Sequence, residues 1–129
     1  TEEATAAIAR FGIRARGPKQ TVRQLSGGNQ QKVVLGKWLA TNPKVLLVDE
    51  PTKGLAPKIV AEVADALQEA SKTVPILLVE QNLDVVRRLA DDAIVIAGGR
   101  VVHTGKARDI LDDESLTTRL LGVSAEAHA

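Results

Sequence analysis

The chain has 129 residues, of which 44% are hydrophobic and 26% charged, and its formal net charge is +1. These are the proportions of a globular domain and not of a disordered polymer, and the weak charge with 2% aromatic residues argues against a nucleic-acid partner. Cysteine is absent, which excludes disulfides and thiolate metal sites, and no apolar run approaches the ~18 to 20 residues that span a bilayer.

Residues 2–12 predict a short helix, because two acidic residues suit its first turn and Gly12 is a suitable stop. The loop that follows is basic and carries Arg14, Arg16, Lys19 and Arg23. We interpret this loop as a solvated connection, with a docking surface as the alternative. From Asn29 to Pro43 the apolar spacing is that of a helix, and we expect Trp38 on this helix to lie in the core.

Two short apolar runs, residues 45–48 and 76–79, predict buried strands. The segment between them has apolar residues at helical spacing, so the three form a β-α-β unit with parallel strands. After a helix through Val86 and Leu89, two strands around Gly98-Gly99-Arg100 predict a hairpin. We expect one or two short surface helices in residues 106–121 and a frayed end in residues 124–129.

Two segments carry residues suited to nucleotide chemistry. Ser26-Gly27-Gly28-Asn29 stands where a loop becomes a helix, so a hydroxyl, closely approaching backbone amides and a positive helix terminus could bind an anion. The strand at 45–48 ends in Asp49, which can help to hold Mg²⁺, and Glu50, which can polarise an attacking water. Taken alone, a flexible helix cap and an acidic strand end explain these residues more simply.

Together the two segments resemble the signature and Walker B motifs of the ATP-binding cassette family, in LSGGNQQKVVLGKWLATNPKVLLVDEPTKGL. The resemblance implies an α/β fold, the C-terminal part of a P-loop NTPase, with parallel strands, flanking helices and a C-terminal hairpin. It implies ATP and Mg²⁺ as cofactors and two ATPase domains that close head to tail. Ser26, Gly27, Gly28 and Asn29 would then contact nucleotide held by the partner domain, Asp49 would serve Mg²⁺, and Glu50 would be the general base.

A third segment, LLVEQN, ends the second strand. By this resemblance Gln81 stands where most of the family has a histidine that contacts the γ-phosphate, and Ala56 stands where many members have an Asp that crosses the dimer interface. Glutamine can donate a hydrogen bond but cannot titrate near neutral pH, so we expect Gln81 to sense the phosphate without acting as an acid or base. A polar strand end is the simpler alternative for Gln81.

No G-x-x-x-x-G-K-[ST] loop occurs in the sequence. We therefore expect residues 1–129 to be a partial, truncated ATPase domain, inactive alone, with an unpaired strand edge at residues 76–79. When complete, it resembles the ATPase of an importer that is cytoplasmic and bound to the inner face of the membrane through permease subunits. A non-enzymatic remnant and a non-transport ATPase of DNA repair or ribosomes are the alternatives.

The transported solute is predicted from two conflicting sets of segments. GGNQQKVVLGKWL resembles sugar importers, whereas GLAPKIV, LLVEQN and DDESLTTRLLGV resemble branched-chain amino-acid importers. The second set covers more of the chain, so we favour amino acids over sugars. His103 and His128 are expected at the surface, because neither has a second metal ligand at a useful spacing.

Overall fold

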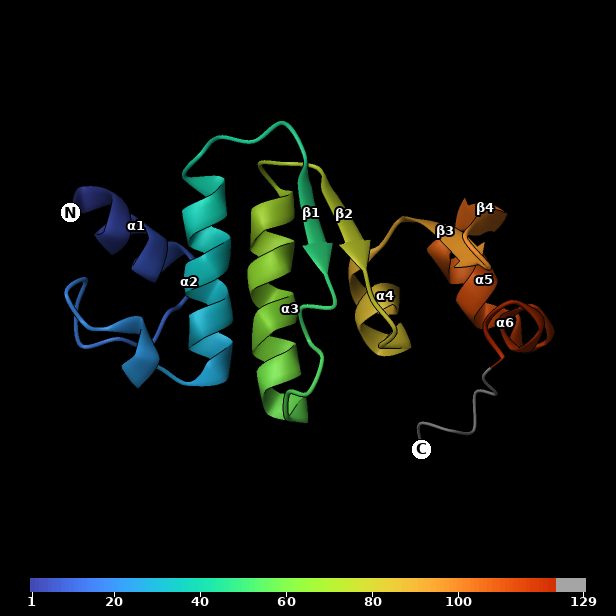
Figure 1. The fold of residues 1–129 in the computed structure, drawn as a ribbon, viewed down its shortest axis with the longest axis horizontal. Coiled ribbons are helices and arrows are strands. Elements are labelled where there is room, and N and C mark those ends of the chain that lie inside the picture. The colour runs from blue at the N-terminus through green and yellow to red at the C-terminus, as the bar shows by residue number, and fades with distance from the viewer. Residues whose placement is uncertain (123–129) are drawn as a thin grey trace. The chain divides into compact units, whose positions relative to one another are not determined.

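A computed structural model of the chain describes residues 1–122. The chain forms two compact units, and the boundary between them in the sequence falls between Val85 and Val86. The first unit contains α1 (Glu2–Arg10), the short 3-10 helix η1 (Val22–Gln24), α2 (Gly27–Leu39), β1 (Leu46–Asp49), α3 (Pro57–Ser71), β2 (Ile76–Val79) and the first residues of α4 (Leu83–Leu89) (Figure 1). The order and type of these elements confirm the predicted α/β arrangement, and the predicted helix and strand ends differ by one to a few residues.

The first unit is built on a parallel pair of strands. β1 and β2 pair in parallel from Leu46 with Ile76 to Asp49 with Val79. The connection between them is α3, whose first residue is a proline, and proline is pre-organised for the first position of a helix. The predicted β-α-β unit is therefore confirmed.

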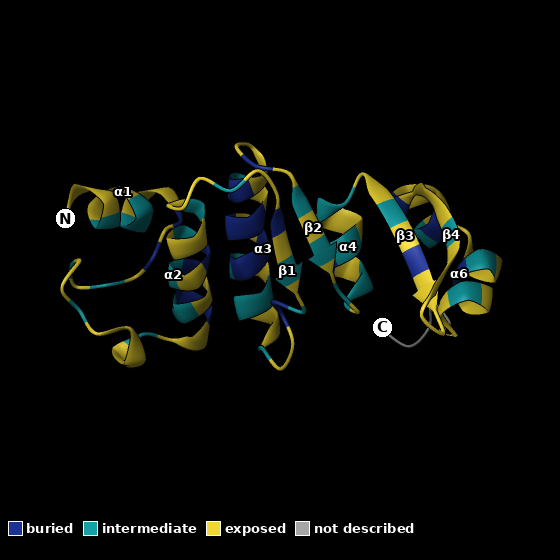
Figure 2. Ribbon diagram, turned by 45° about the horizontal axis from the view of Figure 1, so that its top comes forward, coloured by how far each residue is buried: buried dark blue, intermediate teal, exposed yellow. Residues whose placement is uncertain are grey.

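The core of this unit lies where α3 faces β1 and α2 (Figures 1 and 2). The buried residues of α3 are mostly small or branched and comprise Val63, Ala64, Ala66, Leu67 and Ala70. Leu35 of α2 and Leu46 of β1 are buried as well. Small side chains on α3 allow the neighbouring helix α2 to approach closely. Gly28 of α2 lies at this close approach.

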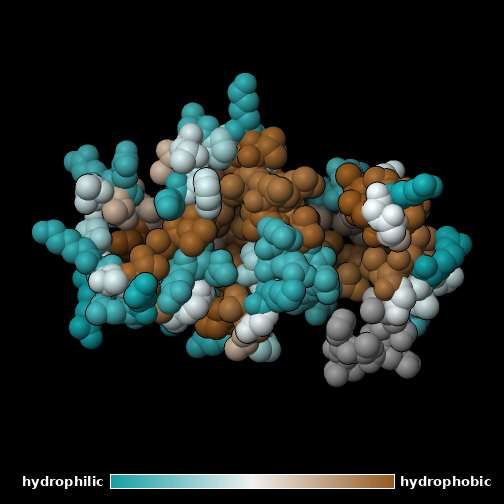
Figure 3. Space-filling model, in the orientation of Figure 1, coloured by the Kyte–Doolittle hydropathy of each residue, from teal (hydrophilic) through white to brown (hydrophobic). Residues whose placement is uncertain are grey.

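Two details of the predicted core are wrong. Trp38 is 55% exposed, because the buried stripe of α2 runs through Gly28, Lys32 and Leu35 and the tryptophan lies beside that stripe. The strands are not buried on both faces either, since Val45, Leu47, Leu77 and Val79 are exposed. Alternate residues of a strand point to opposite faces, so only the face toward α3 is covered. Figure 3 shows the resulting apolar area over β1 and β2.

The second unit contains the remainder of α4, β3 (Asp92–Ala97), β4 (Arg100–Lys106), α5 (Ala107–Asp112) and α6 (Glu114–Leu121). β3 and β4 form an antiparallel hairpin, as predicted. Its turn residues Gly98 and Gly99 have φ of 57° and 73°, and such two-residue hairpin turns need positive φ at both positions. The hydroxyl of Thr117 donates to the carbonyl of Ile110 at 2.6 Å, which ties α6 to α5.

The two histidines were predicted at the surface. His103 lies on β4 opposite Val95 and is partly exposed. His128 and the predicted frayed end at 124–129 lie outside the described residues. No helix in residues 1–122 is both long and apolar enough to cross a membrane.

The exposed sheet face predicts self-association of this chain. Within the described residues β2 pairs with β1 only, so its outer edge and its apolar face are both open to another copy. We expect sedimentation velocity to show concentration-dependent association. Leu77→Lys should weaken it, because a charge on the exposed face opposes burial. Val22→Lys, at an apolar residue on η1 that is 40% exposed, is the matched control. A monomer at all concentrations would contradict this expectation.

Candidate functional site

The structure brings three of the predicted site residues to one edge of the sheet. Asp49 ends β1 opposite Val79, and the N–H of Glu50 donates to the carbonyl of Val79 at 2.8 Å. Gln81 follows two residues after β2. Because the carboxyl ends of parallel strands meet at the same edge, Asp49, Glu50 and Gln81 belong to neighbouring loops there. Asp49 and Gln81 are exposed and Glu50 is half-buried.

Glu50 has a backbone conformation that its side chain does not favour. Its φ is 42°, in the left-handed region that costs a non-glycine residue about 1 to 2 kcal/mol. The conformation is held on both sides, by the hydrogen bond to Val79 and by the Lys53 N–H, which donates to the Glu50 carbonyl at 3.2 Å. Strain of this kind concentrates at functional sites, so it supports a role for Glu50 beyond packing.

The Glu50 carboxylate is engaged by a neighbouring lysine. Nζ of Lys53 lies 2.7 Å from Oε2 of Glu50. The hydrogen bond to Glu50, followed by the charge of that carboxylate, raises the pKa of Lys53 above its ordinary value. Lys53 therefore stays charged at neutral pH, and the pair loosens only as the pH rises through this higher pKa. Because Lys53 is exposed, water and salt weaken the pair and leave the carboxylate able to exchange partners.

The signature-like segment lies at the N-terminus of α2. Ser26 immediately precedes the helix, and its side chain makes no capping hydrogen bond to it. Instead, the Ser26 hydroxyl oxygen accepts from Nδ2 of Asn29 at 2.9 Å. The hydroxyl proton and the first backbone N–H groups of the helix therefore remain available to an anion.

Asn29 is placed to hold Ser26. Its side chain is buried, and its Oδ1 accepts from the backbone N–H of Arg14 at 3.0 Å while Nδ2 donates to Ser26. Nearby, Nζ of the buried Lys32 donates to the carbonyl of Gly12 at 3.3 Å, so the basic loop is attached to α2 at two points. A direct contact of Asn29 with nucleotide stays a prediction, since the observed contacts of its amide lie within the chain.

The two glycines of this segment differ in their surroundings. A Cβ atom on Gly28 would lie 2.5 Å from Cγ2 of Ile59 on α3, which no real contact allows. A Cβ atom on Gly27 would meet Cδ2 of Leu55 at 3.8 Å, which is an ordinary contact. Gly28 is thus required by the packing of α2 on α3, whereas Gly27 has no such requirement and suits the close approach of an anion.

The signature-like segment and the strand-end residues are not linked to each other by the contacts of the described residues. No hydrogen bond or ion pair among residues 1–122 links the segment Ser26–Asn29 with Asp49, Glu50 or Gln81. Sequence reasoning also missed a contact between Thr52 and Glu80 at the strand-end edge. No sequence signal could have found it, because an acidic residue after a strand is equally compatible with a carboxylate in water.

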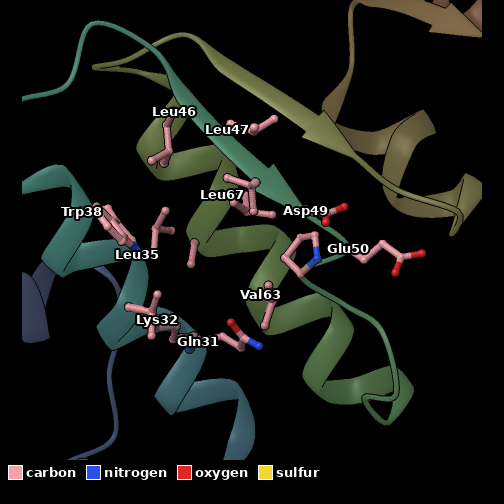
Figure 4. Close-up of a pocket in the computed structure, with 14 residues that line it drawn as sticks. Gln31, Lys32, Leu35, Trp38, Leu46, Leu47, Asp49, Glu50, Val63 and Leu67 are labelled. Atoms are coloured by element: carbon pink, nitrogen blue, oxygen red, sulfur yellow. The ribbon is translucent and has the colours of Figure 1, made fainter. Parts of the chain in front are cut away.

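A groove of about 230 Å³ lies between α2, α3 and β1 (Figure 4). Its lining is mainly apolar and includes Leu35, Trp38, Leu46, Leu47, Val63 and Leu67, with Asp49 and Glu50 at one end. Such a lining suits apolar side chains better than phosphates. In the described part of the chain, no cluster of three or more His, Cys, Asp or Glu could hold a metal. Asp49 alone fits Mg²⁺, which usually keeps several waters and takes further ligands from substrate phosphates.

Comparisons with known proteins agree with this geometry. A family model described as ABC transporter matches residues 1–53. The ribose import ATP-binding protein RbsA of Geobacillus kaustophilus is 40% identical over 105 residues, which is 81% of this chain and 20% of that protein. The structure of cbiO1 from Clostridium perfringens, part of the ABC transporter complex cbiONQ, superposes with a TM-score of 0.76, 28% identity and coverage of 92% of this chain and 47% of that one.

Over most of its length the chain is similar to ATP-binding cassette proteins. The predicted P-loop NTPase fold of this family is confirmed by the solved cassettes that it resembles. One of these is a dimeric cassette in a post-hydrolysis state bound to ADP and Pi, with a TM-score of 0.65, 27% identity and coverage of 83% of this chain and 47% of that one. The chain spans about a fifth of the length of the curated relatives that it matches.

The relatives do not support the preferred solute. Several curated relatives of this chain, from different bacteria, are named ribose import ATP-binding proteins. They favour the sugar alternative over the branched-chain amino acids that the sequence segments favoured. The names of these relatives give no support to the amino-acid preference that rested on GLAPKIV, LLVEQN and DDESLTTRLLGV.

The packing of Gly28 predicts a specific loss of stability. Gly28→Ala places a methyl group against Ile59, so α2 and α3 must separate or Ile59 must leave its rotamer, at a cost of about 1 to 3 kcal/mol. Gly27→Ala is the matched control, because it adds the same methyl group at an ordinary contact distance from Leu55. Urea unfolding of the chain measures both. Equal effects of the two substitutions would show that the helices do not approach as closely as described.

The strain at Glu50 predicts the opposite effect. Glu50→Asn should stabilise the chain by about 0.5 to 1 kcal/mol, because asparagine tolerates the left-handed region better than glutamate. Glu50→Ala is the control, since it removes the same carboxylate and keeps the unfavourable conformation. Urea unfolding of the unmodified chain and the two variants tests this. If the asparagine and alanine variants unfold alike, the backbone strain is not present in solution.

Proposed function

We propose that this chain is the C-terminal half of the ATP-hydrolysing cassette of a sugar importer. The observation that supports it most is the meeting of Asp49, Glu50 and Gln81 at the carboxyl edge of β1 and β2, with Glu50 held in a strained conformation. A strand-end carboxylate, a second carboxylate after it and a phosphate-contacting amide are among the groups that catalyse phosphoryl transfer to water. The phosphate loop would be supplied from outside these residues.

In the proposed reaction each strand-end residue has a separate task. Glu50 leaves Lys53, accepts a hydrogen bond from the attacking water and takes its proton as the water oxygen bonds to the γ-phosphorus. The bond from that phosphorus to the bridging oxygen breaks in the same step, and ADP leaves. Asp49 would help to hold Mg²⁺, and the ion would neutralise charge on the phosphates. Gln81 donates its side-chain N–H to the γ-phosphate and, because an amide does not titrate, keeps that role over the whole physiological pH range.

The segment Ser26–Gly28 is proposed to act on nucleotide held by a second cassette. Its separation from the strand-end residues, together with the dimeric state of the similar ADP-bound cassette, supports this arrangement. The Ser26 hydroxyl, oriented by Asn29, and the N–H of Gly27 would donate to the γ-phosphate across the dimer, with the helix dipole of α2 adding partial positive charge.

The names of the relatives support the partners and the place of action that we propose. Since several similar curated proteins are ribose import ATP-binding proteins, we propose a sugar, and ribose first, as the solute. Membrane permease subunits would carry the solute and hold the cassette at the cytoplasmic face of the membrane. Branched-chain amino acids remain the second candidate, on the segments GLAPKIV, LLVEQN and DDESLTTRLLGV.

The role of Glu50 can be tested in the complete protein that contains this chain. Glu50→Gln should lower the rate of phosphate release from ATP about 10² to 10⁴-fold and leave equilibrium ATP binding intact, because the glutamine keeps its size and loses only the base. Glu114→Gln, the same change on the exposed first turn of α6, is the control. Loss of binding together with turnover, or turnover unchanged, would contradict the proposed role.

A further inference from the structure

Glu80 is the residue after β2, and both oxygens of its carboxylate accept hydrogen bonds. Oε1 accepts from the backbone N–H of Thr52 at 3.3 Å and from the Thr52 hydroxyl in a short hydrogen bond. Oε2 accepts from the backbone N–H groups of Gln81 and Asn82 at 2.9 and 3.1 Å. A carboxylate offers about four lone-pair positions, so these four donors occupy it.

These contacts join the two loops that carry the proposed chemistry. Thr52 stands two residues after Glu50 and is 5% exposed, and Gln81 is the neighbour of Glu80 in the chain. The hydrogen bond from Glu50 to Val79 is the last one between the two strands. Beyond it, the Glu80 carboxylate connects the two segments in place of backbone hydrogen bonds. One side chain therefore bridges the two loops beyond the last backbone hydrogen bond.

The strain at Glu50 gives an independent reason for such a link. A residue at φ of 42° persists in that conformation only when its surroundings over-determine it. The bond to Val79 holds Glu50 from one side, and the attachment of Thr52 to Glu80 holds the loop that follows it. A link between these loops thus opposes relaxation of the Glu50 backbone.

We propose that Glu80 is a positioning residue that holds the Glu50 loop against the Gln81 loop and so sets the distance between the base and the phosphate-contacting amide. The statement about the reaction rests on the proposed function. Because all its lone pairs are engaged, Glu80 itself neither binds Mg²⁺ nor takes the proton of the attacking water. Charge-assisted hydrogen bonds to backbone N–H groups make the link stronger than a pair of neutral groups would.

The link itself can be tested in this chain by amide hydrogen exchange. Glu80→Met keeps the length of the side chain and removes both acceptors, so the amides of Thr52, Gln81 and Asn82 should exchange about tenfold faster. The amide of Leu46, bonded to the carbonyl of Pro75 at the opposite end of the strands, is the internal control and should not change. Unchanged exchange at all three loop amides overturns the proposal.

The consequence for the reaction is tested in the complete protein through Thr52. Thr52→Val keeps the shape of the side chain and removes the hydroxyl donor, and we expect kcat for ATP to fall about tenfold to hundredfold with KM changed less than about twofold. Thr52→Ser restores the hydroxyl and should restore kcat. This split between kcat and KM, with rescue by serine, is not expected of a side chain that only supports folding.

The outcomes separate the two proposals. If the complete protein hydrolyses ATP in a Glu50-dependent way and Thr52→Val turns over like the unmodified protein, the role of Glu80 is overturned and the proposed function stands. If serine fails to rescue, the hydroxyl is not the group that matters and the role of Glu80 is again overturned. If no Glu50-dependent hydrolysis occurs, the proposed function fails, and the positioning role in catalysis fails with it.

Discussion

The parallel pairing of β1 with β2 is the constraint on which the rest of the first unit depends. In the observed register Asp49 lies opposite Val79, and one further backbone hydrogen bond places Glu50 beside the end of β2. A slip by one residue would turn Leu46 away from α3 and expose the core. The burial of Leu46 against α3 therefore secures, at the other end of the same strand, the position of the residues proposed for catalysis.

Much of this fold could be predicted from local signals. Proline and glycine residues delimit the strands and the hairpin, and helical spacing identifies α3, so the order of the elements and the parallel pair were predicted correctly. The covered faces could not be predicted. The helical spacing of apolar residues places Trp38 on a helix. The packing of α2 on α3, however, determines that Leu35 is buried and Trp38 is exposed.

The candidate site, too, could be predicted from the sequence only in part. Asp49, Glu50 and Gln81 were predicted at the ends of two parallel strands, and the observed parallel pairing brings those ends to one edge, which is a property of topology. The positive φ of Glu50, the inward orientation of the Asn29 amide and the steric need for Gly28 depend on atoms far away in the sequence. Gly28 is instructive, because the signature resemblance suggested a phosphate contact and the structure adds a packing requirement. Packing against α3 thus requires Gly28, whereas it does not require Gly27.

The central claim is that Glu50 and Gln81 act on one phosphate while Ser26 and Gly27 act on another. A structure of the complete protein with Glu50→Gln, bound to ATP and Mg²⁺, tests it most directly. The account predicts the Gln81 side chain within about 2.7 to 3.2 Å of a γ-phosphate oxygen, residue 50 beside the attacking water, and Ser26 and Gly27 at the γ-phosphate of the nucleotide held by the other cassette. Ser26 and Gln81 of one chain on the same γ-phosphate, or neither near one, would contradict it.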